Sequence, residues 1–210
     1  LWAALSGDPS SKAPPNCIWR RQIDESLDWI HSFLIREPHG VERLYESEAY
    51  FNIGDKIDID LDVSPWGLGG ILRINGKFES YFTDALTEED LSKFGFARGD
   101  CKGQQTWECL AVLVALRLWF SHWEHRRVCL RIRSDSTTAL QLLLTLRASG
   151  RGPVLIGKEL ALDLARGSYR PNVSQHLPGV ANAGPDALSR MTQPNAGKTV
   201  PSYLVGVQQA

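Results

Sequence analysis

The sequence predicts an α/β domain whose core is a mixed five-stranded sheet with helices on both faces. The stretch from Ile57 to Val63 alternates apolar and polar residues, which is typical of a strand with one buried face. Glycine-rich and Asn-Gly turns after it predict that three antiparallel strands follow one another. A later strand comes after a long helix, and a right-handed crossover of this kind places it parallel to the first.

Composition limits the class of protein. The chain has 210 residues, 43% of them hydrophobic, which supports one ordinary domain with extensions. It has neither an uncharged apolar run of about 18 residues nor a signal pattern, so no membrane partner is expected. The four cysteines lack metal-site spacing, which favours an intracellular protein, cytoplasmic or nuclear. The 23 basic and 24 acidic residues nearly balance, which argues against simple coating of nucleic acid.

Three segments are expected. Residues 1–50 combine a Pro/Ser-rich linker with a helix over residues 18–35, where apolar residues recur at helical spacing. Residues 51–191 form the α/β domain, and residues 192–210 form a flexible tail with a possible docking segment at 203–207. The first residue is leucine, which fits a piece of a longer protein.

The first strand carries Asp58, Asp60 and Asp62 on one face, because successive side chains of a strand point to opposite faces. Such close like charges repel one another, so this face needs open water or a cation. For Asp58 and Asp60 the simpler interpretation is solvated carboxylates on the exposed part of the strand. For Asp62 the residues alone leave open both a solvated carboxylate and a metal ligand.

The residues after Asp62 carry a more specific pattern. The run D-x-S-x-x-G-x-G-G, from Asp62 to Gly70, resembles the opening strand and hairpin of the ribonuclease H family, in the form carried by retroelement reverse transcriptases. In that family the aspartate is a ligand of catalytic magnesium, and the resemblance implies this role for Asp62. Ser64 lies in the same run and is a candidate substrate-binding residue.

A third strand is expected at residues 77–82 and a short capped helix at residues 87–94. The next helix, over residues 104–123, is apolar nearly all round, with Glu108 as its only acid. A buried carboxylate needs a partner or a metal ion, although water and the helix dipole also stabilise an acid near a helix start. The family carries a glutamate followed by a hydrophobic run here, so the resemblance implies a metal ligand.

A fourth strand, at residues 128–133, leads into Asp135 and Ser136 and then into a leucine-rich helix that runs through Leu146. Ser and Asp at a strand-to-helix junction are ordinary helix caps. The family, however, keeps its third carboxylate at the end of this strand, which implies a ligand role for Asp135. Ser136 beside it is a second candidate substrate-binding residue.

The most specific match follows a helix at residues 154–165 and a fifth strand at 172–177. Residues 176–190, H-L-P-G-V-A-N-A-G-P-D-A-L-S-R, resemble the H-x-P-G-x-x-N-x-x-A-D-x-L-S-R ending of retroelement ribonuclease H domains. This match makes Asp186 the fourth ligand, against the alternative of an acid in the first turn of a helix opened by Pro185. The Gly-Pro pair before Asp186 departs from the small apolar pair usual there.

The resemblance covers residues 56–191 and implies hydrolysis of the RNA strand of an RNA·DNA hybrid by two Mg²⁺ ions, with Mn²⁺ as a substitute. It implies a polymerase domain of the same polyprotein as partner, although the chain lacks a Y-x-D-D polymerase signature. Two alternatives stay open: a catalytically degenerate module that only binds template or partner, and another nuclease or an integrase of the same superfold.

Overall fold

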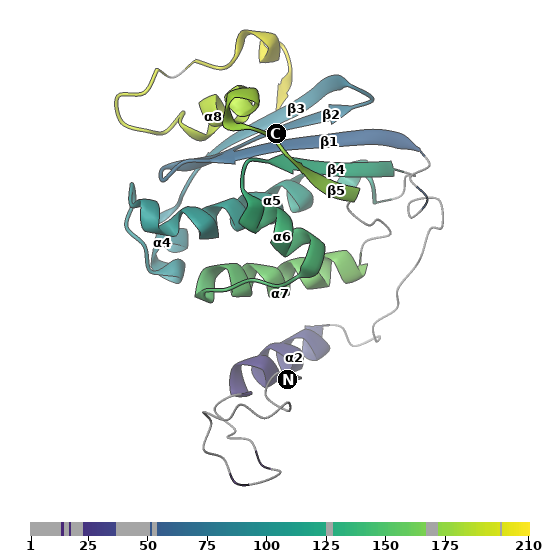
Figure 1. The fold of residues 1–210 in the computed structure, drawn as a ribbon, viewed down its shortest axis with the longest axis vertical. Helices are drawn as coiled ribbons and strands as arrows, with labels where there is room; N and C mark the ends of the chain where they lie inside the picture. The colour runs from purple at the N-terminus through teal and green to yellow at the C-terminus, as the bar shows by residue number, and fades with distance from the viewer. Residues whose placement is uncertain are drawn as a thin grey trace. The chain divides into compact units, whose positions relative to one another are not determined.

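The structure is a computed structural model (Figure 1) that describes residues 14, 17, 23–36, 51, 54–124, 128–166, 172–197 and 199–210. The chain divides into two compact units, Leu1–Glu42 and Arg43–Ala210. In the first unit, helix α2 (Asp24–Arg36) overlaps the stretch predicted to be helical and ends one residue beyond it. Residues 18–22 of that prediction lie outside the described residues. No helix in the described part of the chain is long and apolar enough to cross a membrane.

The second unit is built on one mixed sheet with the strand order β5-β4-β1-β2-β3-β6. Three consecutive strands pair antiparallel with their neighbours, namely β1 (Asp55–Val63), β2 (Gly67–Ile74) and β3 (Lys77–Ala85). Two strands are parallel to β1, namely β4 (Val128–Ser134) and β5 (Asn172–His176). The predicted α/β class and mixed five-stranded sheet are therefore confirmed.

Helices lie on both faces of this sheet (Figure 1). Four are on one side, namely α4 (Glu88–Phe94), α5 (Gln104–Leu118), α6 (Thr137–Thr145) and α7 (Arg151–Arg166). Helix α8 (Ala183–Ser189) lies on the other side and contacts β1, β2 and β3. It begins two residues before Pro185, earlier than the proline suggested. Helix α5 ends at Leu118, earlier than predicted, and a short 3₁₀ turn (Phe120–His122) follows it.

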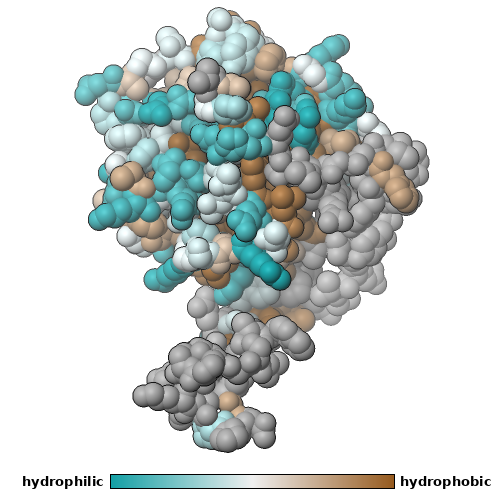
Figure 2. Space-filling view, viewed as in Figure 1, coloured by the Kyte–Doolittle hydropathy of each residue, from teal (hydrophilic) through white to brown (hydrophobic). Residues whose placement is uncertain are grey.

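The two faces of the sheet bury different cores. Alternate residues of β1, including Ile57, Ile59 and Leu61, pack with Trp107 and other side chains of α5 in the larger core. A smaller cluster on the α8 side joins Ile71, Tyr81, Leu188 and Leu204. In the view of Figure 2, hydrophilic residues cover most of the described surface of the second unit, with apolar residues visible between them. The period-2 pattern of β1 thus does separate a buried apolar face from a polar one.

The C-terminal residues extend the sheet. A 3₁₀ turn (Ser202–Leu204) buries Leu204 in the smaller cluster, within the segment expected to dock. A sixth strand, β6 (Gln208–Gln209), then pairs in parallel with β3, which the sequence did not predict. The backbone N–H of Ala210 donates to the Tyr81 carbonyl at 2.9 Å. The 3₁₀ turn at Ser202–Leu204 therefore packs on the same face of the sheet as α8.

Candidate active site

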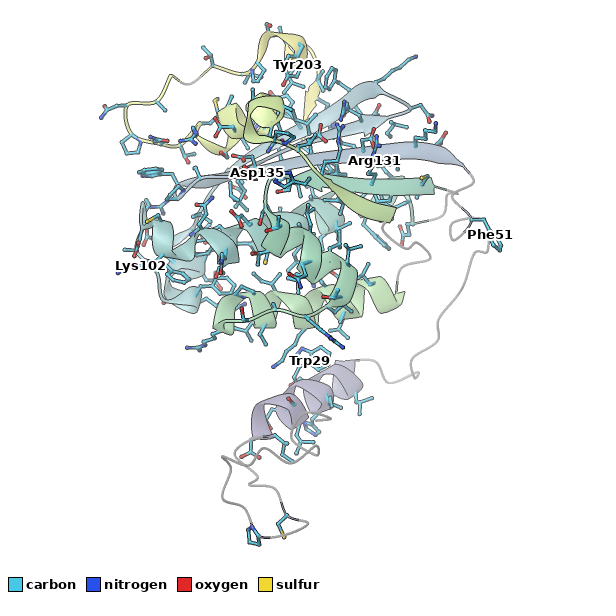
Figure 3. All side chains as sticks on the ribbon, viewed as in Figure 1. Trp29, Phe51, Lys102, Arg131, Asp135 and Tyr203 are labelled. Atoms are coloured by element: carbon cyan, nitrogen blue, oxygen red, sulfur yellow. The ribbon has the colours of Figure 1, made fainter. Side chains whose placement is uncertain are left out.

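Four elements bring the predicted carboxylates toward one end of the sheet. Asp62 is the penultimate residue of β1, and Asp135 follows directly after β4, so both lie at the carboxyl ends of neighbouring parallel strands. Glu108 is on the second turn of α5, and Asp186 is on α8, on the opposite side of the sheet. In Figure 3, Asp135 lies between α8 and α6. Carboxyl ends of parallel strands are where α/β proteins place their ligands.

The charges of these carboxylates influence one another's pKa values. The pKa of Asp62 is raised to about 7, mainly by burial and also by the charges of Asp135 and Asp186, whereas a hydrogen bond from Ser189 and the charge of Arg190 oppose the rise. Burial also raises the pKa of Glu108, and Asp135 again contributes. The charge of Asp135 therefore acts on both Asp62 and Glu108.

Asp62 is held by the segment around α8. Asn182 donates from Nδ2 to Asp62 Oδ1 at 3.3 Å and to the carbonyl of Leu61 at 2.9 Å. The hydroxyl of Ser189 lies 3.0 Å from Asp62 Oδ2 and 3.0 Å from the Asp186 carbonyl. Both side chains are buried, so they fix the orientation of the Asp62 carboxylate. Asn182 Oδ1 is itself buried and has no hydrogen-bond partner among the described residues.

Glu108 is held from the β4–α6 junction. The hydroxyl of Ser136 donates to Glu108 Oε2 and accepts from the backbone N–H of Ala139 at 3.2 Å, as the N-cap of α6. Gln104, one turn before Glu108, donates from Nε2 to the carbonyl of Val63 at 2.9 Å. These contacts tie the start of α5 to the ends of β1 and β4, and the predicted capping role of this junction is confirmed.

Asp186 and Asp135 are the more accessible acids. Asp186 Oδ1 accepts from Arg190 Nε at 2.7 Å, and the two side chains are 42% and 48% exposed. Asp135 is exposed at the start of the loop into α6. A Cβ built on Gly179 would lie 3.9 Å from Asp135 Oδ2, so the turn that precedes α8 passes beside this carboxylate. Two of the four carboxylates therefore face solvent where a substrate can approach.

The glycines of the opening motif let α8 lie directly on β2. A Cβ on Gly69 would be 2.5 Å from the carbonyl oxygen of Pro185 and 2.5 Å from the backbone nitrogen of Ser189. A Cβ on Gly67 would be 2.5 Å from the carbonyl oxygen of Asp84. Any larger residue at either position would displace backbone, so the motif glycines are needed to bring Asp186 and Ser189 to Asp62.

The interpretation of Asp58 and Asp60 as solvated carboxylates is wrong. Asp60 is 8% exposed and accepts from Arg133 at 2.6 and 2.7 Å and from Arg73 at 2.7 Å. Asp58 accepts from Arg131 Nε at 2.6 Å. The repulsion along this face of β1 is relieved by arginines of the two flanking strands, a pairing that depends on strand register and is not visible in the sequence.

Ser64 and Ser136, predicted to bind substrate, both make internal hydrogen bonds. Ser64 is 1% exposed, donates to the carbonyl of Ser189 at 2.7 Å and accepts from the backbone N–H of Gly67 at 3.1 Å. Ser136 is buried against Glu108. In this structure both serines connect parts of the site, and a contact to substrate stays a prediction.

The oxygen donors of the site fit a hard divalent cation such as Mg²⁺. Their mutual repulsion and the partnerless oxygen of Asn182 also favour a cation nearby. As the side chains stand, however, no three Asp, Glu, His or Cys residues in the described part of the chain are grouped closely enough to hold a metal ion. Three of the four carboxylates instead accept hydrogen bonds from protein side chains: Glu108 from Ser136, Asp62 from Ser189 and Asp186 from Arg190.

Sequence reasoning missed the residues that hold the acids, namely Asn182, Ser189, Arg190 and Gln104. Three of them belong to the closing motif of residues 176–190, and their presence in that motif could have indicated a role in the site. Nothing in the sequence indicated Gln104, because its hydrogen bond is to the carbonyl of Val63, at the end of a distant strand.

Comparisons with known proteins return ribonuclease H domains among solved structures, although no family model and no curated protein matches the sequence. The N-terminal ribonuclease H domain of a Mycobacterium tuberculosis protein is 13% identical, with a TM-score of 0.47, over 63% of this chain and 95% of that one. Ribonuclease H1 of Halobacterium salinarum is 15% identical, with a TM-score of 0.48, over 68% of this chain and 98% of that one.

A foamy viral protease–reverse transcriptase in complex with double-stranded DNA is 15% identical, with a TM-score of 0.35. The match covers 80% of this chain and 29% of that one. Because these identities are low and the TM-scores are below 0.5, we base the function on the residues of the site.

Proposed function

We propose that this chain is a metal-dependent endonuclease that hydrolyses the RNA strand of RNA·DNA hybrids, as part of a retroelement reverse transcriptase. The observation that supports the proposal is that β1, α5, the β4–α6 junction and α8 bring Asp62, Glu108, Asp135 and Asp186 toward one end of the sheet, where the charge of Asp135 acts on Asp62 and Glu108. A cluster of this kind has a structural cost, because close carboxylates repel one another, and catalysis is a reason to keep it.

The four carboxylates would hold two Mg²⁺ or Mn²⁺ ions, which when bound activate water and stabilise the leaving oxygen. The residues around them do the positioning. Ser189 and Asn182 fix the carboxylate of Asp62, and Ser136 fixes that of Glu108. Asp135 and Asp186 remain exposed and face the substrate side. Discrimination in favour of RNA would rest on its 2′-hydroxyl, which DNA lacks.

A polymerase domain of the same polyprotein is the partner we propose. The chain has 23 basic and 24 acidic residues, so little overall attraction draws a polyanion to it. We expect the isolated chain to bind a hybrid weakly, with an affinity that falls steeply between about 50 and 200 mM salt. A salt series followed by fluorescence anisotropy measures this, and nanomolar binding at physiological salt would contradict the need for a partner.

The decisive experiment incubates the full chain with a hybrid labelled on its RNA strand in Mg²⁺. We expect RNA fragments from the hybrid, none from single-stranded RNA or duplex RNA, and a complete loss of cleavage in excess EDTA. Full activity in excess chelator would exclude the metal mechanism.

The same assay separates the alternatives. A degenerate module would bind the hybrid but leave it intact. The unchanged chain and Asp62→Asn would then both give uncleaved RNA. A nuclease or integrase of other specificity would instead cut or join DNA, so labelled duplex DNA is included in the assay. Either outcome would replace the proposed reaction while leaving the fold assignment in place.

A further inference from the structure

We propose that Arg190 is the resident counter-ion of the carboxylate cluster, a positioning residue that holds Asp186 in the metal-free protein and releases it to an incoming divalent cation. The inference rests on the proposed function, because it assumes that the cluster binds metal. It goes further by assigning a role to a side chain that carries no ligand atoms.

The geometry of the pair supports an exchangeable contact. Arg190 Nε lies 2.7 Å from Asp186 Oδ1, and neither side chain is buried, with exposed fractions of 48% and 42%. The backbone N–H of Arg190 donates to the Asp186 carbonyl at 3.2 Å, which sets the two residues one turn apart on α8. An exposed ion pair of this type contributes little stability, so a divalent cation can displace the guanidinium.

The charge balance of the cluster gives the pair its role. Arg190 acts on Asp62 in the sense opposite to that of Asp135 and Asp186, and it is also the cation paired with Asp186 at 2.7 Å. The arginines nearest along the sheet are already bound to Asp58 and Asp60. Arg190 therefore lowers the repulsion among the acids when no metal is present.

Removing the guanidinium should have two linked effects. The metal-free cluster loses its counter-charge, so the acids repel one another more strongly. The same loss removes a positive charge that competes with, and repels, an incoming Mg²⁺ ion. At the dielectric of water, which suits a side chain this exposed, one unit charge about 6 Å from a divalent ion changes its affinity by about tenfold, and salt screening lowers this toward about threefold.

The test compares Arg190→Gln with Arg98→Gln in the full, metal-free chain. Arg98 also forms an exposed pair, with Glu88 on α4 at 2.8 Å, and that pair contains no acid of the cluster. Isothermal titration with Mg²⁺ alone is expected to show about threefold to tenfold tighter binding for Arg190→Gln and a change of less than about twofold for Arg98→Gln. Arg190→Lys keeps the charge and should restore the original affinity to within about twofold.

Thermal melting provides the second readout. We expect Arg190→Gln to melt lower than the unchanged chain without metal and to gain more melting temperature from saturating Mg²⁺. An equal loss with and without Mg²⁺ would make Arg190 merely a structural cap of α8 and overturn the proposal. Unchanged or weaker Mg²⁺ affinity in Arg190→Gln would also overturn it.

Failure of the proposed function looks different. If the folded, unchanged chain and all three variants bind no Mg²⁺ and cleave no hybrid, the metal mechanism itself is wrong, and this inference with it. If the unchanged chain binds Mg²⁺ and cleaves the hybrid while Arg190→Gln behaves identically, only the role of Arg190 is refuted.

Discussion

Asp60 and Asp62 lie two residues apart on the same face of the same strand, yet their surroundings are opposite. Asp60 is 8% exposed and bonded to two arginines, whereas Asp62 is 7% exposed and bonded to neutral donors beside further carboxylates. Burial raises the pKa of both, but a direct contact with Arg133 opposes the rise for Asp60. One end of the strand face is thus neutralised by arginines of the protein, whereas the other end has, among the described residues, no arginine in direct contact with its aspartate.

Strand register explains the difference. The first two aspartates face arginines on β4, in the pairs Asp58–Arg131 and Asp60–Arg133. Asp62 lies beyond the last β1–β4 pair, and its partner on β2 is Gly69, which has no side chain and so admits α8. The same residue type therefore pairs with arginines across the sheet at two positions and belongs to the candidate active site at the third.

The strongest test of this contrast is Asp62→Asn. We expect hybrid cleavage to fall by about a thousandfold or more, which corresponds to about 4 kcal/mol in the transition state, because a neutral amide cannot hold the cation. The fold should be retained, and the metal-free protein should melt no lower, since one of the mutually repelling charges is gone. Single-turnover cleavage and thermal melting measure the two effects. A clear loss of melting temperature would assign Asp62 to the structural end of the strand.

The pH dependence of stability gives the next largest effect. The pKa of Asp62 is raised from 3.8 to about 7 in the folded protein. Between these values the folded chain keeps a proton that the unfolded chain has lost, so the contribution of Asp62 to stability falls as pH rises from about 4 to about 7. At about 1.4 kcal/mol per unit, the upper limit of this loss is about 4 kcal/mol.

Urea unfolding of the metal-free chain at several pH values isolates that contribution when Asp62→Asn serves as the reference. We expect the unchanged chain to lose stability relative to the variant as pH rises from about 4, and this relative loss to level off above about pH 7. A difference that does not vary with pH would mean that Asp62 is ionised throughout, as a carboxylate paired with a cation would be.

The sequence predicted the mixed sheet and the directions of its five strands, but not the contacts between side chains of different strands. Alternation in β1, the Asn-Gly turn and the apolar helix with Glu108 are local signals, and local signals survive in a single sequence. The arginine partners of Asp58 and Asp60 are about 73 residues away in the chain, and only the parallel β1–β4 register brings them together.

The candidate site shows the same division. Asp186 could be found through its motif, but the contacts of Ser189 and Asn182 to Asp62 span 127 and 120 residues. Ser64 was grouped with substrate because it lies in the opening motif, whereas its hydroxyl bonds to the carbonyl of Ser189. Motifs indicate which residues belong to a site, and the fold decides which of them support others.

Asp60→Asn tests the part of the β1 face where arginines neutralise the aspartates. The variant leaves Arg133 and Arg73 without their shared anion, and these side chains are only 15% and 21% exposed. Because unpaired, partly buried charges are costly, we expect the free energy of unfolding to fall by about 2 to 3 kcal/mol. Urea unfolding measures this, and any loss of cleavage should be reversed at lower temperature, where the variant is folded. A stable variant without cleavage would instead place Asp60 in the catalytic site.

Asp58→Asn should have the smallest effect, and that ranking tests whether burial decides the outcome. Asp58 accepts one hydrogen bond, from Arg131, whose side chain is 42% exposed and can return to water when its partner is lost. Exposed pairs contribute little, so we expect a stability loss below about 1 kcal/mol and unchanged cleavage. Raising the salt concentration should reduce this loss, because salt screens an exposed pair, but should leave the larger loss in Asp60→Asn almost unaffected. If Asp58→Asn instead destabilises the chain as much as Asp60→Asn does, the three arginines and two aspartates act as one cooperative network, and the two positions cannot be treated as separate pairs.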